Sequence, residues 1–171
     1  MRVPPRAAFA VGLLDPAPTD RLLEFGCGPG VAAALICDRL TTGRLDAIDR
    51  SATAVARTTA RNAMHIAAGR LAVHTASLHE LSDLVEPGSL DAAFGIDVNL
   101  FWTGPADREL SALATALRVG GVLLVGYGTP PGRGAARQIT PAVAAALAAH
   151  GFVDVTEHAD PAGSAVSGRR P

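Results

Sequence analysis

Three glycines at alternate positions carry the strongest chemical signal in this sequence. They stand in "LLEFGCGPG" (22–30), where Gly26, Gly28 and Gly30 follow an apolar run that contains an acidic residue, Glu24. Glycine reaches positive φ and lets a ligand approach the backbone closely, and the first turn of a following helix offers N–H groups without partners. The stretch therefore predicts a turn that holds a nucleotide-like molecule.

The spacing of these glycines distinguishes between two classes of cofactor. Dinucleotide-binding turns prefer G-x-G-x-x-G, whereas here the third glycine, Gly30, comes one position early and Val31 follows it. A carboxylate at Glu24 suits a ligand with a positively charged amino group better than one with a pyrophosphate. Asp49, at the end of "LDAID", can accept hydrogen bonds from both hydroxyls of a ribose, a role that would serve either class.

The elements that must position these residues follow from the alternation of apolar runs and helical patterns. The predicted strands are Arg21–Phe25, Leu45–Asp49, Leu71–Thr75, Leu90–Ile96, Val122–Tyr127 and Phe152–Glu157. The predicted helices are Gly30–Leu40, Ala52–Ala68, Pro105–Leu117 and Pro141–His150, the last with Thr140 as N-cap, and a short one over Leu78–Leu84. This order predicts an α/β fold with a doubly wound, mostly parallel sheet and helices on both faces.

The chain has the size and composition of one domain. Its 171 residues are 49% hydrophobic and 18% charged, enough for a sizeable core. Residues 1–20 are predicted to form an N-terminal helix and linker, and residues 159–171 either a loosely ordered tail or a short last strand. Whether the last strand pair is shortened stays open at this point.

Read together, "LLEFGCGPG", "LDAIDRS", "LDAAFGIDVNLFW" and "ALRVGGVLLVGY" resemble the ordered motifs of the class I S-adenosylmethionine-dependent methyltransferases, over roughly Leu13 to Val155. The resemblance implies a Rossmann-like methyltransferase fold and S-adenosylmethionine as cofactor. It implies that Glu24 holds the methionine amino group, that Asp49 binds the ribose and that Arg50 lies along the adenine. The other cofactor-binding residues that it implies are Phe25, Gly26, Cys27, Gly28, Gly30, Ser77, Leu78 and Asp97.

The segment after the fourth predicted strand is expected to face the methyl acceptor. Asp97 contacts the methionine amino group or acts as a general base, and His79 is a second candidate base. Asn99, Phe101, Trp102 and Tyr127 are expected to bind the substrate, because the few aromatic residues gather at these strand ends. No metal is expected, since "GYGTPPG" lacks the ligands that metal-dependent relatives carry after the fifth strand.

These observations predict methyl transfer from S-adenosylmethionine to a small molecule. The alternatives are a non-catalytic S-adenosylmethionine-binding module and, less favoured, an NAD(P)-binding reductase, for which the chain lacks any lysine. A net charge of −1 without a basic stripe predicts no nucleic-acid partner. The two cysteines, Cys27 and Cys37, lack metal or disulfide spacing and predict a cytoplasmic setting, and no apolar run is long enough to predict a membrane span. The oligomeric state stays open.

Overall fold

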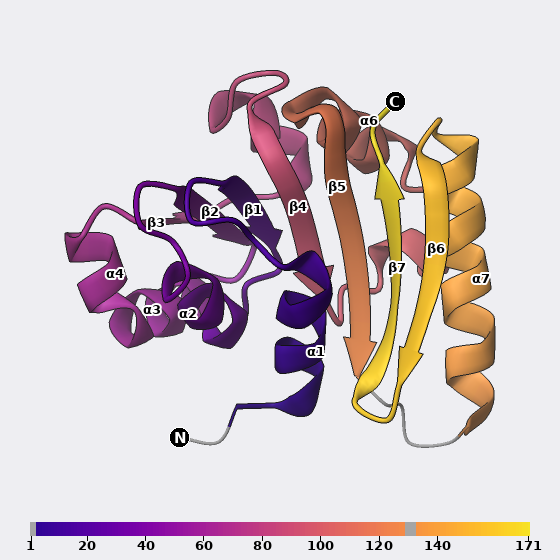
Figure 1. The fold of residues 1–171 in the computed structure, drawn as a ribbon, viewed down its shortest axis with the longest axis horizontal. Coiled ribbons are helices and arrows are strands. Elements are labelled where there is room, and N and C mark those ends of the chain that lie inside the picture. Colours follow the sequence, from indigo (N-terminus) through magenta and orange to yellow (C-terminus); the bar gives the residue numbers. More distant parts are fainter. Residues whose placement is uncertain (1–2, 129–132) are drawn as a thin grey trace.

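A computed structural model describes residues 3–128 and 133–171, with side chains described outside 133–138 (Figure 1). Within these residues, seven strands form one sheet in the order β3-β2-β1-β4-β5-β7-β6. The strands are β1 (Arg21–Phe25), β2 (Arg44–Asp49), β3 (Leu71–Thr75), β4 (Leu90–Ile96), β5 (Leu117–Gly128), β6 (Val153–Asp160) and β7 (Gly163–Arg169). All neighbouring pairs are parallel except the two that involve β7. The predicted doubly wound, mostly parallel sheet is confirmed.

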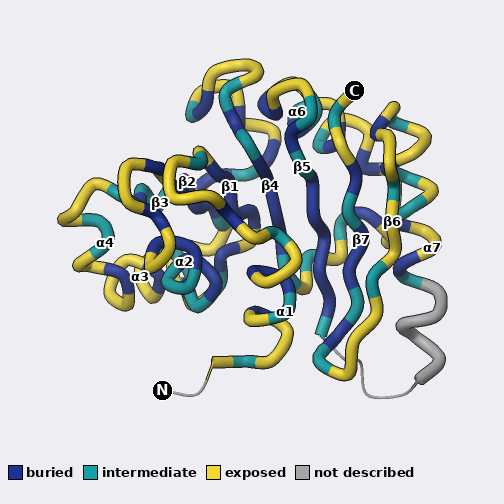
Figure 2. Tube along the Cα trace, in the orientation of Figure 1, coloured by how far each residue is buried: buried dark blue, intermediate teal, exposed yellow. Residues whose placement is uncertain are grey.

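Helices cover both faces of the sheet. They are α1 (Pro5–Leu14), α2 (Val31–Cys37), α3 (Ala52–Arg61), α4 (Ala63–Ala67), α5 (Leu100–Thr103), α6 (Asp107–Ala116) and α7 (Arg133–Ala149), with a 3-10 helix, η1, at Leu78–Asp83. Buried residues of α1 and α2 pack in one core cluster, and those of η1, α5, α6 and α7 pack in another. Two cores on opposite faces of one sheet explain why most of β4 and the second half of β5 are buried (Figure 2).

Single strands contribute to both cores because successive side chains point to opposite faces. In β1, Leu22 packs in the cluster of α1 and α2, while its neighbour Leu23 packs in the cluster of α6 and α7. Both leucines are fully buried. A continuous apolar run therefore predicts a parallel strand covered on both sides, and β1 has the predicted bounds.

The strand order reverses between β1 and β4. β1 pairs with β2 on one side and with β4 on the other. The connection that follows β1 and the connection that follows β4 therefore lead towards opposite edges of the sheet. In open parallel sheets, this reversal opens a crevice at the carboxyl ends of the strands, where ligands bind. The topology places the glycine turn that follows β1 and the segment that follows β4 at that crevice.

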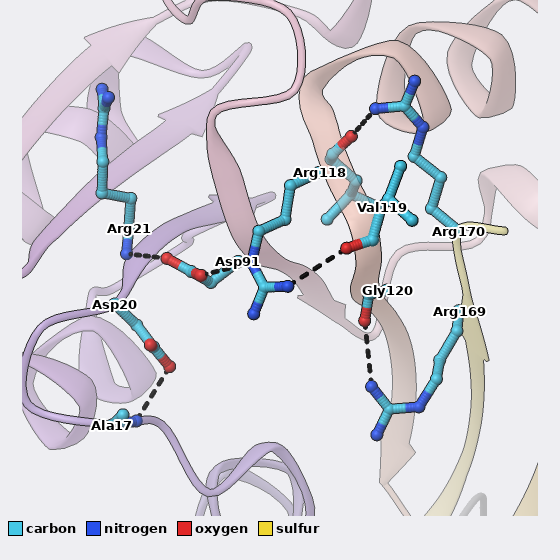
Figure 3. A network of polar contacts seen from close by, with 10 residues as sticks. Ala17, Asp20, Arg21, Asp91, Arg118, Val119, Gly120, Arg169 and Arg170 are labelled. Carbon is cyan, nitrogen blue, oxygen red and sulfur yellow. Dashed lines mark hydrogen bonds and ion pairs between the residues drawn. The ribbon is translucent and has the colours of Figure 1, made fainter.

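At the end of the strands opposite to this crevice, a polar network links neighbouring strands (Figure 3). The backbone N–H of Arg21 donates to Asp91 Oδ2 at 2.8 Å, and Arg118 Nε donates to Asp91 Oδ1 at 2.6 Å. Arg169 Nη1 donates to the carbonyl of Gly120 at 3.0 Å. The contacts join β1, β4, β5 and β7, and they lie away from the carboxyl ends of β1 and β4.

The observed bounds of the helices differ from the predicted ones most in two places, while α2 and α6 are shorter than predicted and Leu117 belongs to β5. The helix predicted over Ala52–Ala68 is divided at Asn62 into α3 and α4, because the Asn62 side chain bonds to backbone carbonyls and competes with the helix. The predicted start at Pro141 with Thr140 as N-cap is wrong. α7 runs through Pro141 from Arg133, and Thr140 lies inside it, since Thr140, Val143 and Leu147 form a buried stripe that holds the helix on the sheet.

The C-terminal residues form a regular part of the sheet. Of the two alternatives for residues 159–171, a loose tail or a last strand, the structure shows the strand: β7 pairs along its length with β5 and β6. Its residues Ala165 and Val166 are fully buried, one in each core. Because β7 lies between two strands, its backbone forms hydrogen bonds on both sides. Its glycine-rich sequence did not indicate this pairing.

Candidate functional site

A pocket of about 740 Å³ opens at the crevice predicted by the topology. Its wall comes from the segments that follow β1, β2, β3 and β4, together with α5 and the first turn of α6. The lining residues are Phe25, Gly26, Ile48, Asp49, Arg50, Ala76, Ser77, Leu78, His79, Ile96, Asp97, Val98, Asn99, Leu100, Thr103 and Glu109. Its volume lies within the range of small-molecule sites, roughly 300–1,000 Å³.

The first glycine of the turn needs to be glycine for two reasons. Gly26 has a φ of 72°, in the left-handed region, and a Cβ atom there would lie 2.7 Å from Val98 Cγ2. Its N–H and that of Cys27 donate to the carbonyl of Ile48 at 2.8 and 3.1 Å. The turn is thus tied to the end of β2 and lies directly against the segment that follows β4.

Two buried polar side chains, one on α3 and one at its C-cap, hold the other side of the turn. Thr58 Oγ1 donates to the Gly28 carbonyl at 2.9 Å, and Asn62 Nδ2 donates to the Gly30 carbonyl at 3.0 Å. A Cβ at Gly30 would lie 2.6 Å from Asn62 Nδ2. Sequence reasoning missed both residues, although their spacing of four on a predicted helix was a usable signal.

Asp49 lies on the pocket wall at the end of β2. Its Oδ2 accepts a hydrogen bond from the Gly28 N–H at 3.0 Å, and its Oδ1 accepts one from the Ser51 N–H at 2.9 Å. A carboxylate has about four lone-pair sites, so each oxygen retains capacity for a further donor. The residue therefore joins the glycine turn to β2 and still presents the acceptors that a ribose diol requires.

Glu24 is buried at 3% exposure and is not part of the pocket wall. Burial, followed by the charge of Asp49, raises the pKa of Glu24 from 4.5 to about 8, and a backbone hydrogen bond from Ala33 offsets this in part. Its Oε2 has no hydrogen-bond partner among the described residues. An acidic group with an unsatisfied oxygen next to the glycine turn is a favourable environment for a positively charged ligand group.

The neighbouring cysteine shows no sign of nucleophilic chemistry. Burial raises the pKa of the Cys27 thiol to about 11, so the thiolate is scarce at neutral pH. Its Sγ lies 3.5 Å from Thr58 Oγ1, whose single hydroxyl proton is shared with the nearer Gly28 carbonyl. Cys27 therefore fills a small position between the glycines, and Cys27 and Cys37 are both free thiols.

On the far side of Asp49, the segment after β3 supplies an apolar and polar wall. Arg50, Ser77 and Leu78 all line the pocket, as predicted residues of a cofactor site should. The Ser77 N–H and Oγ both donate to Glu80 Oε2, at 2.8 and 2.9 Å, in a capping box that begins η1. These bonds lower the pKa of the Glu80 carboxyl and fix the Ser77 hydroxyl away from other acceptors.

Asp97 follows β4 with a φ of 59°, a backbone conformation that few residues other than glycine adopt. Its N–H donates to the Gly126 carbonyl at 2.8 Å, and its Oδ1 accepts from the Gly128 N–H at 2.8 Å. Its Oδ2 lies 2.6 Å from Nε of Arg6 on α1. Sequence reasoning did not find Arg6, because nothing along the chain indicates that α1 reaches the end of β4.

His79 also lines the pocket and has a carboxylate partner. Its Nε2 lies 2.7 Å from Oε1 of Glu109, on the first turn of α6, and Glu109 lines the same pocket. Glu109 was not predicted as a site residue. The pairing leaves Nδ1 of His79 as the nitrogen that can take up a proton, and it orients the ring.

The aromatic residues expected to bind the acceptor are not on this wall. Phe101 is buried in the core with its ring edge-on to Phe25, at a centroid distance of 5.7 Å and an angle of 71°. Tyr127 is buried and donates its hydroxyl to the Val98 carbonyl at 3.0 Å, and burial raises its pKa. Trp102 is 40% exposed and does not line the pocket.

The binding role predicted for Phe101, Trp102 and Tyr127 thus has no support from the lining of this pocket. Aromatic side chains after buried strands are as useful for packing as for binding, and here Phe101 and Tyr127 support the pocket wall from behind. Of the predicted acceptor residues, Asn99 does line the pocket, and it is joined by Leu100 and Thr103 of α5. The helical spacing of α5 turns these residues inward and Trp102 outward.

Among the described residues, no group of three or more histidine, cysteine, aspartate or glutamate side chains could hold a metal ion. No helix in the same residues is long and apolar enough to cross a membrane.

A sequence model of the family described as "Methyltransferase domain" matches residues 22–121, more than half of the chain, which include the glycine turn, Asp49 and Asp97. The chain belongs to the class I S-adenosylmethionine-dependent methyltransferases. The chain is also 31% identical over 141 residues to the uncharacterized protein syc1184_c of Synechococcus sp. (strain ATCC 27144). The match covers 82% of the chain but 33% of that relative, so the chain spans about a third of the relative's length.

Solved structures with the same fold bear different activities. The chain superimposes on geranyl diphosphate methyltransferase in complex with S-adenosylmethionine with a TM-score of 0.73 and 14% identity, covering 96% of this chain and 85% of the other. It superimposes on the cyclase SpnF with a TM-score of 0.75 and 16% identity, covering 96% and 80%. At these identities the likeness shows the fold alone.

The residues of the pocket fit S-adenosylmethionine. A Cβ at Gly26 would collide with Val98, so the glycine lets the turn lie directly against the segment that follows β4, and both line the pocket. Asp49 retains acceptors for the ribose, and the apolar side chains of Ile48 and Leu78 suit a flat purine. The buried, unsatisfied oxygen of Glu24 suits the positive charge of the methionine group.

Proposed function

We propose that the methyltransferase binds S-adenosylmethionine in the 740 Å³ pocket and methylates a small molecule there. The observation that carries the proposal is the junction of Asp49 with the glycine turn, through the Gly28 N–H, at the wall of one pocket that extends to α5. A ligand bound to Asp49 through its ribose would lie across the carboxyl ends of the central strands. The part of the pocket beside Asn99, Leu100 and Thr103 then receives the acceptor.

In this proposal each side chain of the cofactor region has a binding role. S-adenosylmethionine, when bound, supplies a methyl group on a sulfonium, which is intrinsically a good donor. Asp49 accepts hydrogen bonds from the ribose hydroxyls, while Arg50 and Leu78 flank the adenine. Asp97 provides negative charge for the amino group of the methionine end, and the buried carboxyl of Glu24 offers it the acceptor Oε2, which has no partner among the described residues.

The contribution of the protein to the rate is alignment of the acceptor and exclusion of water. An acceptor with an O–H group must also lose a proton, and His79 Nδ1 is the proposed proton acceptor because Glu109 fixes Nε2. Asp97 is less suited to that role, since both of its carboxylate oxygens are engaged by the protein. The mixed polar and apolar wall of α5 favours a small, partly apolar acceptor.

The buried free thiols of Cys27 and Cys37 support the proposal that the protein works in a reducing, cytoplasmic setting.

One observation favours a second candidate function, a non-catalytic S-adenosylmethionine-binding module. Phe101, Trp102 and Tyr127 do not form the acceptor wall that was expected of them.

Isothermal titration with S-adenosylmethionine, S-adenosylhomocysteine and NADPH tests the cofactor. Both adenosyl ligands should bind and NADPH should not. Asp49→Ala should weaken binding more than tenfold, because two charge-assisted hydrogen bonds are worth roughly 1.5–3 kcal/mol each. The control is Asp83→Ala, an exposed aspartate outside the pocket. A loss below threefold in Asp49→Ala, with an unchanged circular dichroism spectrum, would contradict the assigned ribose site.

Transfer is tested separately, by incubating the protein with methyl-labelled S-adenosylmethionine and a metabolite extract. Label should appear on small products. Label on protein or RNA would overturn the proposed class of acceptor. Firm cofactor binding without transfer to any fraction would favour the non-catalytic module.

A further inference from the structure

A second, smaller hollow lies between η1 and α6, beside the main pocket. Its volume is about 180 Å³. Its wall is mainly apolar and is formed by Leu81 of η1, by Val85 and Pro87 of the following segment, and by Ala112 and Ala116 of α6. A cavity of roughly 150 Å³ with apolar walls is large enough to bind benzene. This space, the η1–α6 hollow, therefore has the size and the lining for one small ring or a short aliphatic group.

The η1–α6 hollow adjoins the main pocket at His79. This side chain lines both spaces, and its Nε2 is 2.7 Å from Oε1 of Glu109 on the first turn of α6. Glu109 lines the main pocket. A molecule bound at this pair in the main pocket thus has an apolar space directly beside it.

The charges at this end of the main pocket favour a cation. The Glu109 side chain is 15% exposed, and only its Oε1 has a hydrogen-bond partner among the described residues. A carboxylate has about four lone-pair sites, so Oε2 stays available to a donor of the ligand. Of the described residues that line the pocket, Arg50 is the one arginine, and it follows Asp49 at the ribose end. An anionic group beside Glu109 would meet a like charge without an arginine of this lining to balance it.

A hydroxyl group can also donate to Glu109, but an ammonium group is the better partner. Its hydrogen bond to a carboxylate is charge-assisted on both sides, and such bonds are about twice as strong as neutral ones. The acidic side chain and the apolar hollow next to it together describe a ligand with a cationic end and a compact apolar end.

We propose that the methyl acceptor is an amine with a small apolar group, whose nitrogen lies at Glu109 and His79 and whose apolar group occupies the η1–α6 hollow. This inference rests on the proposed function. The ammonium first gives a proton to His79 Nδ1, the ring nitrogen that is not engaged by Glu109. The freed lone pair of the nitrogen then forms the bond to the methyl carbon, while the electrons of the broken carbon–sulfur bond stay on sulfur.

Three probes with the same ring separate the charge of the ligand from its shape. They are 2-phenylethylamine, a cation at neutral pH, 2-phenylethanol, which is uncharged, and phenylacetate, an anion. Each is titrated into the full chain saturated with S-adenosylhomocysteine, and amide NMR spectra report both the affinity and the place of binding. The amine should bind about tenfold more tightly than phenylacetate, with the alcohol between them. The amide signals of Leu81, Val85 and Ala112 should shift with the amine.

The role of the acidic side chain is tested by Glu109→Gln, which keeps its size and removes its charge. The change should weaken 2-phenylethylamine about tenfold and bring its affinity close to that of the alcohol. The affinity for S-adenosylhomocysteine should stay within about twofold of the wild-type value, because Glu109 has no role in the proposed cofactor region. Glu157→Gln, the same change at an exposed position of β6, should alter neither affinity.

The η1–α6 hollow is tested by filling it. Ala112→Phe places a ring in the hollow, and Ser82→Phe does so from an exposed residue of its rim, which keeps the test open if the first variant does not fold. Both variants should weaken 2-phenylethylamine about tenfold and leave the affinity for S-adenosylhomocysteine unchanged, since the ring of the probe loses its apolar contacts. Ser111→Phe adds the same ring at an exposed position of α6 outside the hollow and should bind the amine like the wild type.

Each contrary result overturns a different part of the inference. Phenylacetate that binds as tightly as the amine, or an amine affinity that Glu109→Gln leaves unchanged, refutes the cationic end. Amide shifts confined to the main pocket, with full amine affinity in Ala112→Phe and Ser82→Phe, refute the apolar subsite. Binding of S-adenosylhomocysteine without binding of any probe refutes the amine acceptor and leaves the proposed function intact, whereas a protein that does not bind S-adenosylhomocysteine refutes the proposed function itself.

Discussion

Glu24 should make the protein less stable as the pH rises towards 8, and replacing it by glutamine should remove that dependence. The carboxyl is buried on β1 at 3% exposure, and its Oε2 has no partner among the described residues. Desolvation disfavours the ionised form, and the nearby charge of Asp49 adds to the effect. The folded protein therefore keeps a proton that the unfolded chain releases.

The size of the effect follows from the two pKa values. In the unfolded chain Glu24 ionises near 4.5, and in the folded protein near 8. Below pH 4.5 both states are protonated and the stabilising contribution is fully present, and it is lost as the pH rises through the folded pKa. Each pH unit in this window changes the free energy of unfolding by about 1.4 kcal/mol, or about 4 kcal/mol between pH 5 and 8.

Urea unfolding followed by circular dichroism at pH 5, 6, 7 and 8 measures this slope. The wild-type protein and Glu24→Gln should diverge by about 4 kcal/mol over the range, because all other titrating groups are common to both. Glu157→Gln, the same change at an exposed position of β6, should keep the wild-type slope. Parallel slopes for wild type and Glu24→Gln would refute the assignment of a neutral, buried Glu24.

Two further predictions concern the glycine turn. Gly26→Ala should destabilise the protein by more than Gly69→Ala and should abolish S-adenosylhomocysteine binding: the two glycines share a φ near 72°, but a Cβ would meet Val98 at 2.7 Å only at Gly26 and has nothing within 4 Å at Gly69. Similar unfolding free energies and intact binding in both variants would contradict this. Thr58→Val should lower stability by about 1 kcal/mol and weaken cofactor binding severalfold, since it removes the donor to the Gly28 carbonyl at 2.9 Å; unaltered thermal unfolding and titration curves would show that α3 does not hold the turn.

Much of the cofactor region was predictable because it is local in sequence. The glycine turn follows β1 directly, and Asp49 ends β2, so the parallel order of the strands is enough to bring them to one edge. Asn99 and His79 line the pocket for the same reason, each following a strand. Residues at strand ends thus reach the site wherever the sheet is parallel.

The partners of these residues could not be predicted, because they come from elements whose packing the sequence does not specify. Arg6 reaches Asp97 from α1, and Glu109 reaches His79 from α6. The orientation of a side chain on a helix also decides its role, and α5 turns Thr103 inward and Trp102 outward. In the sequence, an arginine or a tyrosine that supports a site cannot be distinguished from one that does not.

The sequence by itself predicted the parallel strands and the glycine turn, since apolar periodicity and glycine spacing are local properties of the chain, and the resemblance of its motifs implied the cofactor. The tertiary structure decided how the chemistry is arranged. It made Glu24 a buried, mainly neutral acid instead of a surface carboxylate, because the charge of an acid depends on the elements that exclude water from it. It also placed Tyr127 behind the pocket wall, where its hydroxyl donates a hydrogen bond to the carbonyl of Val98. The two residues are 29 positions apart in the sequence, so only folding brings them together.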